Sequence, residues 1–376
     1  MTKSLFIVTT VPITLKGILT GQPRNINKEY DVSLVSSPTE DLAVVGREEG
    51  IPVYPVKMER GISPTKDLIS LWKMIELFRI HKPYAVHSYT PKAGLIAMLA
   101  GFITRVPVRI HTFTGLLFPT AKGFKRYILR QMDRLICACA TSIVPEGEGV
   151  KNDLYSFGVT DKAMKVIGNG NIAGVDTELF SADLVSKDIA LLKRNFGFTA
   201  DDFVFSFVGR FTEDKGFYEL IQAFDKLPQN AKLLLIGSED ERLPLPIDLS
   251  KRINDEPRIH VTGWIDDVRA AIGASSILVL PSYREGFPNT PIQAGSMGLP
   301  CIVTDVNGSN EIITPGENGW NIPPRDSIAL ELAMLEAMNC KTLKAMSVNA
   351  RANIQQKYER SFYINELKKF YREKIG

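Results

Sequence analysis

The chain has 376 residues, 44% of them hydrophobic and 23% charged, and its formal net charge is +3. This is ordinary globular composition, and the length predicts two domains rather than one or three. Its four cysteines lack the spacing of a metal site, and three of them lie in apolar runs: Cys137, Cys139, Cys301 and Cys340. We therefore expect reduced thiols in a cytosolic protein and no metal site.

The charge is divided unequally along the chain. Residues 1–175 contain 22 Lys and Arg against 14 Asp and Glu, whereas the remainder contains 23 against 28. A basic first half predicts contact with nucleic acid, phosphorylated lipid or an anionic membrane. Nucleic acid is disfavoured because the basic residues are not interleaved with base-stacking aromatics. No signal peptide is evident, and the uncharged apolar run at residues 93–104 is too short to span a bilayer.

Short apolar runs alternate with longer amphipathic ones along the whole chain. This alternation occurs twice and predicts an α/β fold of two doubly wound domains with parallel sheets. We expect the boundary within residues 174–200, which are polar and irregular. The expected strands are residues 4–9, 31–37, 84–88, 106–113 and 141–146, then 202–210, 231–238, 258–264, 274–282 and 299–306.

In such folds ligands bind beyond the carboxyl ends of the strands. Arg210 ends one expected strand, and Lys215 and Gly216 open the next helix. Two cations beside a helix N-terminus suit a diphosphate, although a solvated surface loop would have the same pattern. Ser238 and Trp264 end two further strands.

The stretch REGFPNTPIQAGSMGLP, residues 284–300, follows another expected strand. Pro291 and Gly298 predict a helix from about 291 to 297. Thr290 and Gln293 fit a capping box, in which the glutamine only satisfies a backbone N–H. The ordinary interpretation of Glu285 is a solvated loop carboxylate, although the loop around it is mostly small or apolar.

These residues resemble the E-x7-E region of retaining glycosyltransferases of family 4. Glu285, Gly286, Ala294, Gly298 and Pro300 match the family pattern, whereas Gln293 stands where the second glutamate is expected. VGRFTEDKG, NGSNEIITPGENGWNIPPRD and the hinge segment KVIGNGNIAGVDTELF also match, so the resemblance covers essentially the whole chain.

The resemblance implies the GT-B architecture, with two facing Rossmann-like domains and a C-terminal helix that crosses back to the first. The acceptor-binding domain would span residues 1–180 together with about 360–376. The donor-binding domain would span 200–358. The GNGNIAG segment resembles a dinucleotide-binding loop. The family resemblance places it instead at the interdomain hinge.

The resemblance also implies roles for the strand-end residues. Glu285 would bind donor-sugar hydroxyls and steady charge near the anomeric carbon, while Arg210 and Lys215 would stabilise the leaving diphosphate. Gln293 would bind the ribose hydroxyls, with weaker bonds than a carboxylate makes. The remaining expected donor contacts are Gly17, Ser238, Trp264, Ile265, Gly286, Phe287, Asn289 and Thr290.

Three stretches of the first half carry the acceptor-side expectations. His111 follows a strand where family members have a catalytic histidine, but in members with a His-Gly pair the matching position is Thr114. His87 and Lys92 lie in HSYTPKAG, which resembles the branch that builds capsule and O-antigen, and we expect them on the acceptor side. Residues 116–134 interleave five cations with apolar side chains, which favours either a solvated basic helix or contact with anionic lipid.

The expected function is retaining transfer of a sugar from a UDP-sugar, plausibly an N-acetylhexosamine, to a saccharide on a polyprenyl diphosphate. The resemblance implies no cofactor and no metal, and a place in the cytoplasm or at the inner face of the membrane. The alternative is a catalytically impaired partner subunit that binds a sugar nucleotide and supports another transferase, because the second glutamate is missing. A sugar-nucleotide epimerase of the same architecture is a third possibility.

Overall fold

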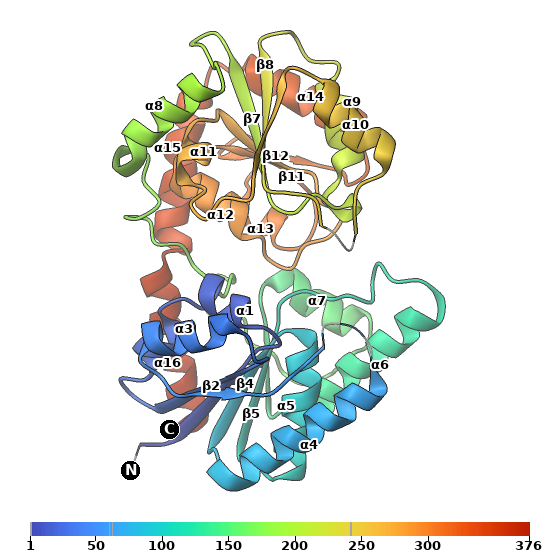
Figure 1. The fold of residues 1–376 in the computed structure, drawn as a ribbon, viewed down its shortest axis with the longest axis vertical. Coiled ribbons are helices and arrows are strands. Elements are labelled where there is room, and N and C mark those ends of the chain that lie inside the picture. The colour runs from blue at the N-terminus through green and yellow to red at the C-terminus, as the bar shows by residue number, and fades with distance from the viewer. Residues whose placement is uncertain (1, 60, 62, 241–242) are drawn as a thin grey trace. The chain divides into compact units, whose positions relative to one another are not determined.

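The computed structural model describes residues 2–59, 61, 63–240 and 243–376. The chain forms two compact units, each built around its own parallel sheet. Unit 1 comprises Met1–Ala173 and Ser361–Gly376, and unit 2 comprises Gly174–Arg360 (Figure 1). The α/β class with two doubly wound sheets is therefore confirmed.

The sheet of unit 1 has the order β3-β2-β1-β4-β5-β6, and all of its strand pairs are parallel. Its strands are β1 Ser4–Val8, β2 Asp31–Ser36, β3 Val53–Pro55, β4 Ala85–Tyr89, β5 Val108–Phe113 and β6 Ser142–Pro145. Its helices are α1 Pro12–Gly17, α2 Gln22–Ile26, α3 Glu40–Glu49, α4 Pro64–His81, α5 Pro91–Ile103, α6 Gly123–Cys139, α7 Glu148–Ser156 and α16 Arg360–Ile375.

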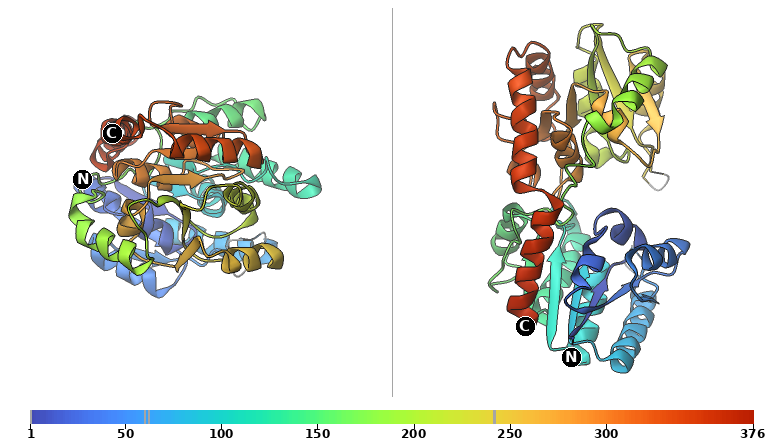
Figure 2. Two further views of the ribbon diagram at one scale, coloured as in Figure 1. Left: turned by 90° about the horizontal axis from the view of Figure 1, so that it is seen from above. Right: turned by 90° about the vertical axis from the view of Figure 1, so that its left-hand side faces the viewer.

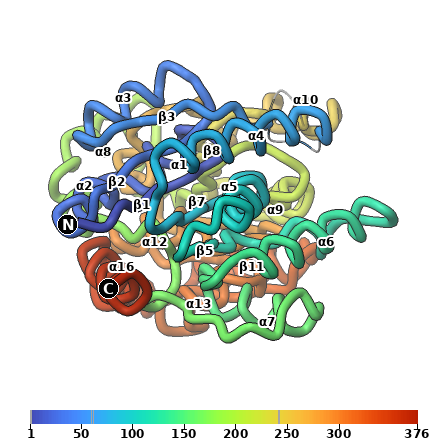
Figure 3. Tube along the Cα trace, turned by 90° about the horizontal axis from the view of Figure 1, so that it is seen from below, coloured from blue at the N-terminus to red at the C-terminus, as the bar shows by residue number. Residues whose placement is uncertain are grey.

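Helices cover both faces of this sheet because its strands are apolar on both sides. Phe6 and Val8 of β1 belong to one buried cluster, and the alternate residues Leu5 and Ile7 belong to another. The first cluster lies under α4, α5 and α6, which follow one another side by side (Figure 3). The second includes side chains of α1, α3 and α16.

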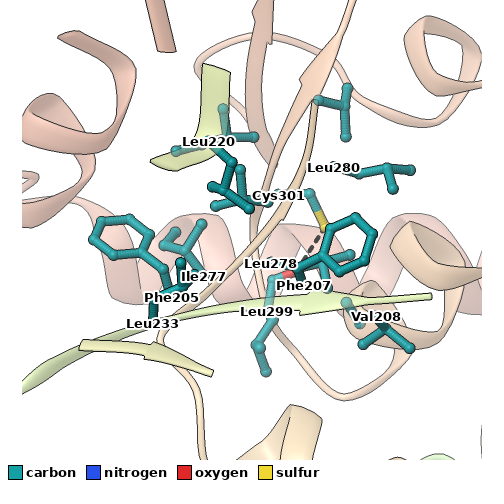
Figure 4. Close-up of a cluster of buried hydrophobic side chains, with 14 of the residues drawn as sticks. Phe205, Phe207, Val208, Leu220, Leu233, Ile277, Leu278, Leu280, Leu299 and Cys301 are labelled. Carbon is teal, nitrogen blue, oxygen red and sulfur yellow. Dashed lines mark hydrogen bonds between the residues drawn. The ribbon is translucent and has the colours of Figure 1, made fainter. Parts of the chain in front are cut away.

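Unit 2 repeats the arrangement with the order β12-β11-β10-β7-β8-β9. Its strands are β7 Phe203–Val208, β8 Ala231–Ile236, β9 Ile259–Gly263, β10 Ile277–Leu280, β11 Cys301–Thr304 and β12 Gly319–Ile322. Phe205, Phe207 and Leu278 are fully buried in its core (Figure 4). Its helices are α8 Ser186–Asn195, α9 Phe217–Phe224, α10 Ile247–Asp255, α11 Arg269–Gly273, α12 Asn289–Ser296, α13 Ser309–Ile312, α14 Ser327–Met338 and α15 Leu343–Lys357, with 3-10 turns η1 Asp183–Val185 and η2 Glu213–Lys215.

The last helix returns to unit 1, as expected. The chain leaves unit 2 after α15, where the Arg360 N–H donates to the Val175 carbonyl at 2.9 Å. Helix α16 then packs into unit 1 through Leu367, Phe370 and Tyr371, each almost completely buried. The right-hand view of Figure 2 shows this red helix alongside the strands of unit 1.

Candidate active site

The carboxyl ends of β7, β8, β9 and β10 form one edge of the unit 2 sheet, because all of these strands are parallel. Two glycines, Gly216 and Gly308, allow the connecting segments to approach this edge closely. Gly216, between η2 and α9, has a φ of +74°, and a Cβ there would overlap the Pro281 carbonyl at the exit of β10. A side chain at position 216 would be both strained and blocked.

Lys215 and Glu285 meet at this edge. The Lys215 Nζ donates to Glu285 Oε1 at 2.6 Å, and the two side chains are only 22% and 13% exposed. A charge-assisted bond in this half-buried position is stronger than a surface ion pair. The structure therefore brings together the cation and the carboxylate that lie 70 residues apart in the chain.

The exit loop that carries Glu285 is itself fixed by close packing. Gly308, just before α13, has a φ of +73°, and a Cβ there would overlap the backbone of Gly286 and Phe287. The side chain of Phe287 is buried and packs against Tyr358 with ring centroids 5.6 Å apart. Any contact of Phe287 with a ligand would therefore use its backbone.

Arg210 lies at the same edge but is much more exposed. Its guanidinium pairs with the Asp240 carboxylate, and its side chain is 61% exposed. An exposed pair of this kind contributes little stability, so the guanidinium can exchange Asp240 for another anion at small cost. Arg210 and Lys215 thus differ: Arg210 is an exposed surface cation, and Lys215 is a largely buried cation held by Glu285.

The capping-box interpretation of Gln293 is wrong. Helix α12 begins at Asn289 rather than Pro291, its N-cap is Pro288, and no side-chain cap hydrogen bond is present. The Gln293 side chain is partly exposed and, among the described residues, makes no side-chain hydrogen bond. Its amide is therefore not needed to hold the helix together.

Sequence reasoning missed three residues that support the β10 exit loop. The Tyr283 hydroxyl donates to the Glu219 carboxylate of α9 at 2.6 Å, and the Arg325 guanidinium lies 3.9 Å from the ring centroid. Burial and the neighbouring Glu219 raise the pKa of Tyr283, so it stays a donor. An aromatic residue directly after a buried strand was the only signal in the sequence.

The predicted donor contacts at β8 and β9 are spread along the edge. Ser238 has its carbonyl bonded to the Phe211 N–H at 2.9 Å, while the residue itself is exposed. Trp264 is 70% exposed directly after β9, and Ile265 is half-buried against the unit 2 core. Thr290 and Asn289 lie in the first turn of α12.

His111 does not lie at the carboxyl edge of the unit 1 sheet as expected. It is inside β5, almost completely buried, with Nδ1 2.9 Å from the Ser88 hydroxyl. Gly94 of α5 lies so close above it that a Cβ there would overlap the imidazole ring. Burial lowers the pKa of His111 to about 3, so the ring is neutral. In this conformation the proposed catalytic contact has no geometric support.

His87 is also buried rather than presented to a ligand. Its Nδ1 lies 2.6 Å from the Tyr371 hydroxyl of α16, and its Nε2 lies 2.7 Å from the Thr112 hydroxyl. Burial, together with the charge of His111, lowers its pKa well below the ordinary value. Both ring nitrogens are engaged, so the histidine ties α16 to the sheet instead of binding an acceptor.

The other acceptor-side residues are distributed along the edge. Lys92, at the start of α5, is buried and pairs with Asp67 of α4 at 2.5 Å. Thr114 follows β5 directly and is partly exposed. Gly17 ends α1, with open space around it, and is therefore not in the loop after β1. That loop instead carries Thr10, whose hydroxyl lies 2.7 Å from that of Thr90.

Neither a metal centre nor a membrane-spanning helix is found among the described residues. They contain no group of three His, Cys, Asp or Glu side chains that could hold a metal ion. No helix in the part of the chain that the structure describes is long and apolar enough to cross a membrane.

Solved structures define the class of fold. The Anabaena protein HepE, solved in complex with UDP, superposes with a TM-score of 0.79 at 19% identity, covering 99% of this chain and 100% of that one. WaaG, a glycosyltransferase involved in lipopolysaccharide biosynthesis, superposes with a TM-score of 0.73 at 14% identity over 98% and 99% of the two chains. The fold is GT-B.

Sequence comparison gives the family. Residues 26–170 match the glycosyl transferase 4-like domain, and residues 202–342 match glycosyl transferases group 1. The capsular polysaccharide biosynthesis glycosyltransferase CapM of Staphylococcus aureus is 32% identical, covering 92% of this chain and 90% of that protein. An Escherichia coli UDP-Gal:alpha-D-GlcNAc-diphosphoundecaprenol alpha-1,3-galactosyltransferase is 26% identical over 92% and 89%. The chain belongs to the family 4 glycosyltransferases.

Proposed function

We propose that this protein transfers a sugar, with retention of configuration, from a UDP-sugar to a saccharide carried on a polyprenyl diphosphate. The observation that carries this proposal is the Lys215–Glu285 pair at the carboxyl edge of unit 2. The name of the S. aureus relative supports capsule assembly, and the name of the E. coli relative supports a UDP-sugar donor and an acceptor on a polyprenyl diphosphate. The sugar is a hexose or an N-acetylhexosamine.

Unit 2 would bind the donor. Lys215 and Arg210 would neutralise the diphosphate, and Gln293 would bond to the ribose hydroxyls through its amide. Glu285 would accept hydrogen bonds from the hydroxyls of the donor sugar. The short α9 and α12 add backbone N–H groups close to this edge.

The reaction exchanges one bond to the anomeric carbon for another. The bond from that carbon to the diphosphate oxygen breaks, and a bond to the acceptor hydroxyl oxygen forms on the same face. The acceptor proton passes to the leaving diphosphate oxygen. Lys215 and Arg210 stabilise the charge that develops on UDP, which is the main electrostatic demand of this step.

We propose that neither a metal nor another cofactor takes part. The largely buried cation at Lys215 and the exposed one at Arg210 supply the positive charge that a metal would otherwise provide. Activity measured with excess EDTA should equal activity without it. A loss that added magnesium restores would contradict this part of the proposal.

Unit 1 would bind the acceptor close to a membrane. The loop before α6 and its first turns carry Lys122, Lys125 and Arg126, and Phe124 and Tyr127 stack with ring centroids 6.2 Å apart. Phe124 is 76% exposed. Cations interleaved with exposed aromatic rings suit an anionic lipid surface at the inner face of the membrane. Equal sedimentation with anionic and neutral vesicles at low salt would contradict this role.

The test of the function is turnover with UDP-sugars and a short polyprenyl-diphosphate saccharide. Wild-type protein should release UDP in step with product, and the product linkage should keep the donor configuration. A partner subunit would show no turnover alone, and its support of another transferase would survive Glu285→Gln. Interconversion of the UDP-sugar without an acceptor would instead indicate an epimerase.

A further inference from the structure

A cavity of about 430 Å³ lies in unit 1, at the opposite edge of the sheet from the strand exits. Its walls come from the ends of α4 and α5 and from the residues that lead into β4 and β5. The lining is Phe78, Arg79, Lys82, Pro83, Tyr84, Thr104, Arg105, Val106 and Pro107. Three of these nine residues are cations and none is acidic.

The three cations are not used in ion pairs. Arg79, Lys82 and Arg105 have no salt bridge to an acidic group among the described residues. Each lies at the C-terminal end of a helix, and such ends carry about half a negative charge. Two helix ends therefore offset about one of the three positive charges, and the cavity keeps a net positive potential.

The backbone of two of these cations is strained. Among the described residues only five other than glycine have a positive φ, and Lys82 and Arg105 are two of them, at +46° and +59°. The Lys82 N–H donates to the Phe78 carbonyl at 2.9 Å, and the Val106 N–H donates to the Gly101 carbonyl at 2.8 Å. These are helix-ending turns in which glycine is the usual residue.

Apart from the hydroxyl-bearing Tyr84 and Thr104, the rest of the cavity lining is apolar. Phe78 and Val106 are buried lining residues, whereas Ile80 and Ile103, each directly next to a lining residue in the sequence, are exposed. A basic cavity whose lining also includes buried apolar side chains suits a ligand that carries both an anionic group and an apolar one.

We propose that this cavity binds a phosphate monoester or diester group through Arg79, Lys82 and Arg105. Guanidinium and ammonium groups are the side chains best suited to phosphate oxygens. The phosphate can come from a phospholipid headgroup or from a small soluble ester. The site is separate from the donor edge of unit 2 and does not depend on the proposed transfer reaction.

The first test is calorimetric titration with glycerol 3-phosphate at low ionic strength, in a Lys215→Met background that removes the phosphate site expected in unit 2. The double variant Lys82→Gly and Arg105→Gly should bind at least fivefold more weakly. Its melting temperature should not fall, because glycine adopts this backbone without strain. The control variant Lys28→Gln and Arg47→Gln loses the same charge from exposed positions and should bind as before.

The second test uses vesicles of phosphatidylcholine with and without phosphatidylglycerol, with Lys122, Lys125 and Arg126 changed to Gln so that α6 does not contribute. If the Gly double variant binds the anionic vesicles more weakly but binds glycerol 3-phosphate as the parent does, the ligand is a lipid headgroup. If the variant binds glycerol 3-phosphate more weakly but binds the vesicles as the parent does, the ligand is a small soluble ester. Equal binding of both probes by variant and parent, or no binding of either, overturns the proposal.

Discussion

At the scale of single residues, the 2.6 Å bond between Lys215 and Glu285 has a consequence for binding. A diphosphate has to compete with a carboxylate for the Lys215 ammonium group. The carboxylate also places a negative charge beside the site where the diphosphate would bind. Under the proposed function, the pair would reduce the affinity for UDP and would position Glu285 for the sugar.

Glu285→Gln should separate these two effects. The amide has the same shape but no charge, so UDP affinity should stay equal or rise, while kcat falls by about 100-fold or more. Lys215→Met should instead weaken UDP binding by about 10- to 100-fold, because a charge-assisted bond contributes about 1.5–3 kcal/mol. Titration calorimetry with UDP and turnover assays measure the two quantities. A kcat of Glu285→Gln near that of wild type would contradict the assigned role.

Gln293→Glu tests the departure from the family pattern. Gln293 takes no part in the cap of α12, so the change should leave stability within about 0.5 kcal/mol. A carboxylate makes stronger bonds to ribose hydroxyls, so KM for the UDP-sugar should fall severalfold. An unchanged KM, measured at fixed acceptor concentration, would show that this side chain does not contact the nucleotide.

At the scale of elements, glycine marks the places where two segments approach most closely. Gly94 on α5 faces the ring of His111 on β5, and Gly216 faces the end of β10. Helix α5 can lie this close to the sheet only because position 94 has no side chain. The same contact buries His111 and keeps it neutral.

Gly94→Ala should destabilise unit 1 by about 1–3 kcal/mol, even though alanine favours a helix, because the added carbon overlaps the His111 ring. Gly17→Ala is the matched control. Position 17 is also helical, at the end of α1, but has open space around it, so the change should stabilise by up to about 1 kcal/mol. Urea unfolding of both variants, followed by circular dichroism, measures the difference.

At the scale of the molecule, unit 1 contains buried groups whose ionisation opposes folding. His87 and His111 have folded-state pKa values below the unfolded value, so protons bind preferentially to the unfolded chain below about pH 6.5. Burial raises the pKa of Asp133 on α6 to about 7, so this carboxyl binds a proton more readily in the folded state. As pH falls below 6.5, the two histidines lower the free energy of unfolding of unit 1, and Asp133 partly offsets this loss.

The free energy of unfolding of unit 1 should therefore fall by about 1.4 kcal/mol per pH unit below pH 6.5. This slope is the net effect of two histidines and one opposing carboxyl. Asp133→Asn removes the opposing group and should roughly double this slope. Hydrogen exchange of amides in β4 and β5, compared at pH 6.5 and 5.5, reports the free energy of opening unit 1. A slope that Asp133→Asn leaves unchanged would contradict this assignment.

Much of this protein follows from its sequence. The alternation of apolar and amphipathic runs predicted both parallel sheets, because hydrophobic periodicity is a local property. Arg210, Lys215 and Glu285 were found because each follows a buried strand, and parallel strands bring their ends to one edge. The return of the last helix to the first unit came from the family resemblance.

Only the tertiary structure decided which of these residues contact one another and which are covered. The strand positions of His87 and His111 do not reveal that α16 and Gly94 lie against them, since those contacts join segments far apart in the chain. The bonds from Lys215 to Glu285 and from Tyr283 to Glu219 have the same origin. Burial and partner choice depend on how elements pack, and a local pattern does not contain that information.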